Sequence, residues 1–227
     1  MYRDCSHNII DVKHCLSDLE TDSCKQSRHV VSKVLRMSVS GYREILEKNT
    51  NVKVLHLFRD PRAVIHSRIN TQPYPLNSPG QTGLVIDKNI QALCQKMALD
   101  LKGGTQLAID FPNRFRFVMY EDIYESDTSM IELHSFVGMS ITKSGLMKTR
   151  KSFSDVLRGM EHGSGKQRKE NNSFWWRNYL SWSIVKKVDR MCGTLMQELG
   201  YQTINSEKHL RQFNKTDLLA KLTYILS

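Results

Sequence analysis

The sequence predicts an α/β protein in which a parallel β-sheet is flanked by helices. Short apolar segments alternate along the chain with longer segments of helical periodicity, which is the pattern of parallel-sheet proteins. The segment 52–58 is too continuously apolar to alternate, as is typical of a strand covered on both faces. With 227 residues and 40% hydrophobic content, the chain can bury a core of ordinary size.

The first strand lies between two predicted helices. A helix is predicted over 27–48, where apolar residues three and four positions apart share one face. After the strand 52–58, Asp60-Pro61 predicts the start of a helix that ends near Ile69. Asp is a favoured N-cap residue, and proline suits the first helical position because the amide there has no partner within the helix.

The middle of the chain contains a long loop, a helix and the second strand. Three prolines and two glycines predict a loop over 71–88. A helix follows over 89–109, and the Gly103-Gly104 pair weakens its end. The second strand, 115–119, runs directly into the sequence Tyr-Glu-Asp.

Two further helices are predicted in the C-terminal part. The first covers 129–137 and ends at a glycine, as helices commonly do. After a polar, basic stretch over 143–172, apolar residues recur every three or four positions over 173–199, which predicts a long helix. Gly200 ends that helix, and the tail 201–227 has room for one short amphipathic helix.

These elements predict a polar N-terminal segment over 1–27, one domain over 28–205 and a C-terminal tail over 206–227. The chain has no run of about 18 apolar residues and no apolar signal-peptide segment at its start. We therefore expect neither a membrane span nor an export signal in this sequence. Sequons at Asn171 and Asn214 would accept glycans in a secretory compartment.

The charge favours anionic partners. The formal net charge is +10, from 33 Lys+Arg against 23 Asp+Glu, and the sequence pI is about 9.4. Phosphate groups, nucleic acids and acidic glycans all fit this charge. Five cysteines without a C-x-x-C pair do not predict a zinc site, and their disulfide pairing is not readable from sequence.

The stretch "VLHLFRDPRAVIHSR" (54–68) concentrates arginines at the predicted end of the first strand. Ligands of open parallel sheets bind beyond the carboxyl ends of the strands, where Arg59 stands. An anion there could rest on the helix tip, or lie along its flank between Arg59 and Ser67. Ser67 is about 9 Å along the axis from Pro61, so one phosphate cannot comfortably contact both tip and Ser67. In the alternative without a ligand, Asp60 caps the helix and Arg59 pairs with a carboxylate.

The same stretch resembles the 3′-phosphate-binding motif of the carbohydrate sulfotransferases, close to the Golgi enzymes that sulfate the 6-hydroxyl of N-acetylglucosamine or galactose. In that family the motif R-D-P-R-A, with a serine four residues later, binds the 3′-phosphate of the sulfate donor PAPS (3′-phosphoadenosine 5′-phosphosulfate). The resemblance implies that Arg59 and Ser67 bind this phosphate, and it makes Arg62 and Arg68 further candidates.

Two other segments support the resemblance, which covers about 28–202. "VMYEDI" resembles the family's strand-end Tyr-Glu-Asp, and "WRNYLS…CGTLMQELGY" resembles its C-terminal Trp-rich helix ending in Leu-Gly-Tyr. The stretch "GMEHGSGKQ" departs from the P-loop pattern, but the family closes this region over the nucleotide. This implies that Lys166 and Arg168 reach the donor.

The family also holds the 5′-phosphosulfate in a loop containing Gly and Ser/Thr after its first strand. Glycines let consecutive backbone N–H groups converge on an anion, and residues 1–50 contain only Gly41. The resemblance implies the P-loop-NTPase-like parallel sheet of the sulfotransferase fold, and we expect this chain to lack the loop and the first strand of that sheet. A truncated form, a fragment and a donor-binding remnant without activity would each explain this, and we favour truncation.

The resemblance implies direct sulfuryl transfer from PAPS to a sugar hydroxyl, without a metal, by a protein that in full length resides in the Golgi. The partner would be a glycan or glycoprotein acceptor, and the sequence identifies no catalytic base. The alternative is a non-enzymatic basic module that binds nucleic acid or glycosaminoglycan through its positive charge. The chain has no recognisable nucleic-acid-reading motif.

Overall fold

The computed structural model describes residues 27–34, 37–70, 83–159 and 173–212, with the backbone alone described for 153–159. The chain divides into two compact units, Met1–Met37 and Ser38–Ser227. The described residues of the first unit form no helix or strand. No helix within the described ranges is long and apolar enough to cross a membrane.

The helix predicted over 27–48 is wrong for its first half. A short 3₁₀ turn, η1 (Val39–Gly41), leads into helix α3 (Tyr42–Lys48), and residues 27–34 and 37–38 before it are not helical. Val31, which the helical stripe placed in the core, is 87% exposed. An amphipathic helix gains most of its stability from burial of its apolar face, and the apolar side chains described before η1 are exposed to solvent.

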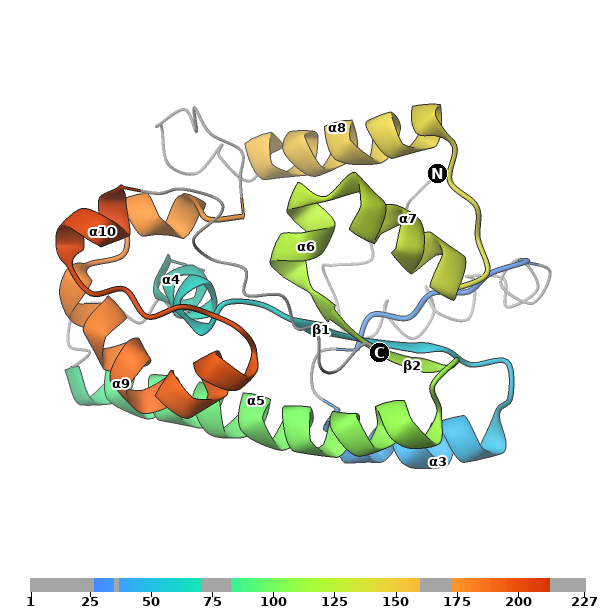
Figure 1. Cartoon of the computed structure of the whole chain (residues 1–227), viewed down its shortest axis with the longest axis horizontal. Helices are drawn as coiled ribbons and strands as arrows, with labels where there is room; N and C mark the ends of the chain where they lie inside the picture. Colours follow the sequence, from blue (N-terminus) through green and yellow to red (C-terminus); the bar gives the residue numbers. More distant parts are fainter. Residues whose placement is uncertain (1–26, 35–36, 71–82, 160–172, 213–227) are drawn as a thin grey trace, which may run out of the picture. The chain divides into compact units, whose positions relative to one another are not determined.

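The sheet is parallel, as predicted, and in the described residues it consists of two strands (Figure 1). Strand β1 (Val54–Phe58) pairs with strand β2 (Phe115–Met119) without a register offset. Helix α4 (Pro61–Asn70) follows β1 and helix α6 (Tyr120–Glu125) follows β2. Both strands therefore lead into a helix at the same edge of the sheet.

Helix α5 (Gly83–Asp110) runs along the strands in Figure 1 and covers one face of the sheet. Gly104 permits this close packing, because a Cβ at this position would clash with the ring of Phe117 and lie 3.1 Å from Phe115 Cζ. The helix continues through the glycine pair that was expected to weaken its end. It also begins six residues earlier than predicted, and residues 71–82 of the expected loop lie outside the described residues.

The opposite face of β1 is more open than predicted. Val54 and Phe58 are buried, whereas Leu55 is 39% and Leu57 is 54% exposed. Coverage on both faces was expected from the unbroken apolar run, and that expectation is wrong for this strand. The run cannot by itself distinguish a doubly covered strand from one with an open apolar face.

The long C-terminal helix predicted over 173–199 is two elements. A 3₁₀ turn, η3 (Trp175–Asn178), precedes helix α9 (Trp182–Glu198), and the chain is extended at Ser181 between them. Helix α9 packs against α5, and the disulfide Cys94–Cys192 joins the two helices with a Cα–Cα distance of 5.3 Å. This distance is ordinary for a disulfide.

The remaining helices lie around β2 and the C-terminal segment. Helix α7 (Asp127–Phe136) ends before a glycine, as predicted, and helix α8 (Lys143–Gly159) occupies a stretch for which no helix was predicted. The short helix expected in the tail is α10 (Glu207–Arg211). Arg177 donates hydrogen bonds to the carbonyls of His209 and Leu210, which ties α10 to η3.

Candidate functional site

The two strands end together, with Phe58 paired to Met119. Arg59 and Tyr120 come next, and the guanidinium carbon of Arg59 lies 4.4 Å from the centre of the Tyr120 ring. Nε of Arg59 is buried without a hydrogen-bond partner, and within the described ranges Arg59 forms no ion pair with a carboxylate. An arginine that rests on an aromatic ring and keeps unused donors is suited to bind an anion.

Asp60 begins helix α4, as the sequence predicted. The N–H of Arg62 donates to Oδ1 of Asp60 at 2.8 Å, and the N–H of Val64 donates to the Asp60 carbonyl at 3.0 Å. Asp60 is thus the N-cap, and Pro61 is the first helical residue. The cap fixes the direction in which the chain leaves Arg59.

The side chain of Arg62 points into the protein and is fully buried. Its guanidinium pairs with Asp60 at 2.8 Å and with Asp189 at 3.3 Å, donates to the Gln202 carbonyl at 3.1 Å, and lies over the ring of Trp176. Burial opposes the charged form, but the two carboxylates outweigh it and raise the pKa of Arg62. Arg62 therefore joins α4 to α9 and the residues that follow it.

The Leu-Gly-Tyr sequence after α9 returns the chain to the site. Gly200 has a φ of +78°, and the N–H of Tyr201 donates to the Met196 carbonyl at 2.7 Å, which is the glycine-terminated helix end. The phenol of Tyr201 then donates to Oε2 of Glu121 at 2.8 Å, and Oε1 of Glu121 accepts from the N–H of Asp60 at 3.0 Å. The three segments that carry the resemblance thus meet.

Glu121 is fully buried in this cluster. Burial, and then the negative charge of Asp60, raise the pKa of Glu121 to about 7, although the hydrogen bonds from Asp60 and Tyr201 act in the opposite direction. Burial and the nearby Glu121 also raise the pKa of Tyr201 well above its ordinary value. Burial raises the pKa of Asp189 as well, with Arg62 opposing it.

The raised pKa of Glu121 predicts a pH-dependent stability. Between its ordinary pKa of 4.5 and about 7, the folded chain retains a proton that the unfolded chain releases. This contribution to stability is complete below the unfolded pKa and is lost as the pH rises through the folded one. From about pH 5.5 to 8, we expect the wild type to lose about 2 kcal/mol more unfolding free energy than Glu121→Gln. Urea titrations at both pH values measure this, and equal losses in the two proteins would contradict it.

The other predicted site residues are less completely described. Ser67 and Arg68 are exposed on α4, with Ser67 about 9 Å along the helix axis from Pro61. Arg68 forms no hydrogen bond or ion pair with a side chain or backbone group in the described part of the chain. Lys166 and Arg168, like the sequons, lie outside the described residues. Arg59 and Ser67 remain the predicted pair for a phosphate.

Asp189 is a member of the cluster that the sequence patterns do not identify. It lies on α9 between Val185 and Cys192, which are both buried. An acid beside an apolar helix face needs a cation, and this signal in the sequence could have suggested a partner such as Arg62. The direction from which that cation comes is not readable from helical periodicity.

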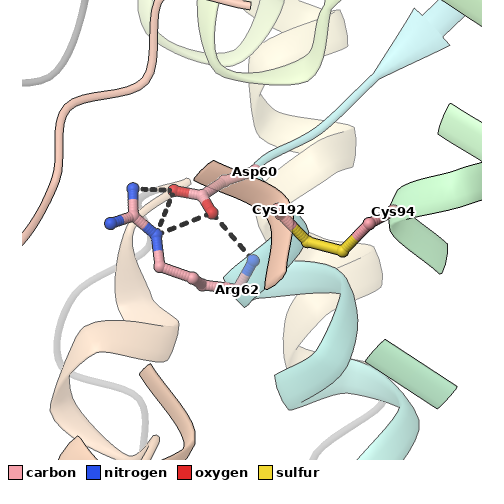
Figure 2. The surroundings of a disulfide bond; sticks show 4 residues. All are labelled: Asp60, Arg62, Cys94 and Cys192. Atoms are coloured by element: carbon pink, nitrogen blue, oxygen red, sulfur yellow. Dashed lines mark hydrogen bonds and ion pairs between the residues drawn. A yellow bond between two sulfur atoms is a disulfide. The ribbon is translucent and has the colours of Figure 1, made fainter. Parts of the chain in front are cut away.

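Figure 2 draws the Asp60–Arg62 pair together with the Cys94–Cys192 disulfide. Cys192 follows Asp189 by three residues on α9, which is nearly one helical turn. The disulfide therefore fixes to α5 the part of α9 that supplies the second carboxylate to Arg62. Across the four described ranges, no group of three His, Cys, Asp or Glu side chains could hold a metal ion.

The sequence of this chain is similar to those of known proteins. The sulfotransferase domain matches residues 3–200. The chain is 27% identical over 230 residues to carbohydrate sulfotransferase 1 of Danio rerio, covering 94% of this chain and 54% of that protein. It is 26% identical over 220 residues to carbohydrate sulfotransferase 6 of Homo sapiens, covering 85% and 53%.

Among solved structures, the fold is similar to mouse sulfotransferase SULT7A1 complexed with PAP, with a TM-score of 0.47, 14% identity, and coverage of 83% of this chain and 70% of that one. The chain spans about half the length of the curated relatives named above. The domain match extends over the strands, the Arg59 turn, the Tyr-Glu-Asp segment and α9. The chain therefore belongs to the sulfotransferase domain family.

Proposed function

We propose that this chain is the donor-binding part of a carbohydrate sulfotransferase that uses PAPS, and that Arg59 and Ser67 hold the donor's 3′-phosphate. The observation that carries the proposal is the unused Nε donor of Arg59, buried at the carboxyl end of β1. A phosphate offers the acceptors that this donor lacks, and a guanidinium can bind two of its oxygens at once. Ser67 is an exposed residue of helix α4, and its hydroxyl is the second group that we assign to this phosphate.

Arg62 has a supporting role in this proposal. Its guanidinium is occupied by Asp60, Asp189 and the Gln202 carbonyl, so it stabilises the start of α4 below the phosphate. Arg68, Lys166 and Arg168 remain candidates for further contacts with the donor. The donor bound here would supply the sulfuryl group, and the described residues would fix its nucleotide end.

The acceptor would be a sugar hydroxyl, and we favour the 6-hydroxyl of an N-acetylglucosamine or galactose unit in a glycan or glycoprotein. In the transfer, the sugar oxygen forms a bond to sulfur, the bond from sulfur to the donor phosphate breaks, and the hydroxyl proton passes to a base. The relatives' names support a carbohydrate acceptor. A labelled-donor assay on glycans blocked or free at the 6-hydroxyl would separate this position from the others.

We propose the Golgi lumen as the location of the full-length protein. The Cys94–Cys192 disulfide supports this, because such bonds persist in oxidising secretory compartments and are rare in the cytosol. Immunofluorescence of the full-length protein against Golgi and cytosolic markers tests it.

The donor site predicts a loss of nucleotide affinity in Arg59 variants. Isothermal titration calorimetry with adenosine 3′,5′-bisphosphate should give at least about 30-fold weaker binding by Arg59→Ala, because two charge-assisted hydrogen bonds are lost. The affinity of Arg59→Lys should lie between those of the wild type and Arg59→Ala, because lysine keeps the positive charge but lacks the planar guanidinium that binds two oxygens at once. Ser67→Ala should lose a smaller factor.

The matched control is Lys102→Ala, which removes an exposed positive charge from α5 and should bind as the wild type does. Equal affinity of the wild type and Arg59→Ala would refute the assignment of Arg59. Salt-sensitive binding of random oligonucleotides, without any response to the bisphosphate, would instead favour the alternative of a basic binding module.

A further inference from the structure

A buried carboxyl group lies directly behind the proposed phosphate-binding turn. Glu121 bonds to Asp60 through one oxygen and to Tyr201 through the other, at 3.0 and 2.8 Å. Its side chain is fully buried, so it cannot reach an acceptor sugar. Neither a phosphate contact nor the proton transfer of the reaction explains this residue.

The group that Glu121 binds is the peptide N–H between Arg59 and Asp60. Asp60 is itself fully buried, so without Glu121 this N–H would lack an acceptor in a place that water does not reach. Tyr120, the preceding residue, lies under the Arg59 guanidinium. Tyr120 and Glu121, which follow β2, thus contact Arg59 and Asp60, which follow β1.

We propose that Glu121 is a positioning residue for the donor site, which holds the Arg59 backbone in place through the Asp60 N–H and is itself held by Tyr201. This inference rests on the proposed function, because it assumes that Arg59 binds a phosphate. A phosphate grip requires the guanidinium to stay within a fraction of an ångström of its working position. A hydrogen bond to the adjacent peptide group controls that position more directly than packing of the side chain does.

The charged and titratable groups in contact with Glu121 are Asp60, at the start of α4, and Tyr201, which follows α9. Behind them, Arg62 pairs with both Asp60 and Asp189 of α9. A bound phosphate adds negative charge to this neighbourhood and favours the protonated carboxyl group. The nucleotide affinity of the wild type should therefore gain relative to Glu121→Gln as the pH falls from about 8 to 6. Both proteins share the phosphate's own protonation, so the difference between them reports Glu121.

The test compares the wild type with Glu121→Gln, Glu121→Leu and Tyr201→Phe, by calorimetry with adenosine 3′,5′-bisphosphate and by melting temperature. The amide oxygen of Gln can still accept from the Asp60 N–H, so at pH 7 this variant should bind within about threefold of the wild type. Leu offers no acceptor, and its affinity should fall about tenfold or more. In Tyr201→Phe, Glu121 still accepts from the Asp60 N–H but loses its hydrogen bond from Tyr201, so the nucleotide affinity should fall a few-fold.

The control for general destabilisation is Leu107→Ala, which removes a buried side chain of α5 near the start of β2, at the opposite end of that strand from the turn. It should lower the melting temperature without a change in affinity. Wild-type affinity in Glu121→Leu, or equal losses in the Gln and Leu variants, would overturn the inference alone. Should Glu121→Leu fail to fold, unchanged affinity in Tyr201→Phe overturns it. No binding by the folded wild type would overturn the proposed function, and the inference with it.

Discussion

Arg62→Met should lower the free energy of unfolding by about 3–5 kcal/mol, the expected effect of removing one partner from a buried ion-pair cluster. Asp60 and Asp189 would remain in the interior without their cation, beside the partly ionised Glu121. The Gln202 carbonyl would also lose its donor. Methionine fills most of the space, so the loss would report charge and hydrogen bonding more than volume. Urea unfolding near pH 7 measures it.

Arg68→Met is the matched control for this prediction, since it makes the same substitution on the same helix at an exposed side chain. We expect it to change the unfolding free energy by less than about 0.5 kcal/mol. Arg62 was also a candidate for phosphate binding from the sequence motif. An Arg62→Met protein that unfolds like the wild type but has lost the nucleotide would contradict the supporting role and restore that candidate.

Removing the Cys94–Cys192 disulfide should have an effect of similar size. The two cysteines are 98 residues apart in sequence, and closing a loop of this length restricts the unfolded chain enough to contribute about 4–5 kcal/mol in the chain-entropy model. A Cys94→Ala/Cys192→Ala protein should therefore unfold at a clearly lower urea concentration under oxidising conditions. Helix α9 carries Asp189, so loss of its covalent link to α5 should also weaken the ion pair between Asp189 and Arg62.

The redox control uses the same two proteins in a thiol reductant. The wild type should then lose most of its extra unfolding free energy relative to the double variant. The remaining difference should reflect only the replacement of two buried thiols by two smaller methyl groups. An advantage that survives complete reduction would show that packing, and not the covalent link, stabilises this pair of helices.

Local chemistry made the Arg59 turn predictable from the sequence. Asp60 and Pro61 are neighbours, so the cap and the helix start depend on a few adjacent residues, and both predictions are confirmed. The parallel pairing of the strands followed from their alternation with helices, and it is confirmed as well. Such features need no knowledge of distant parts of the chain.

Features that depend on distant neighbours were predicted less well. The stripe predicted over 27–48 is buried at Leu46 on α3 but exposed at Val31, where the chain is not helical. The stripe over 173–199 continues through the extended Ser181. Periodicity records which side chains are apolar but not whether the backbone between them stays helical. The contacts of Glu121 with Asp60 and Tyr201 join separate motifs, so each motif could be recognised while their meeting could not.

The separations within this cluster bear on how the protein acquires its binding ability. Asp60 is 61 residues from Glu121, Arg62 is 127 residues from Asp189, and Arg62 is 140 residues from Gln202. Contacts of such long range form late, because large loops must close before they gain stability. During synthesis the turn near residue 60 leaves the ribosome long before the segments that hold it. If Arg59 binds the nucleotide as proposed, affinity would therefore arise only after the segments with Asp189 and Gln202 have been made and docked, although Arg59 precedes both in the chain.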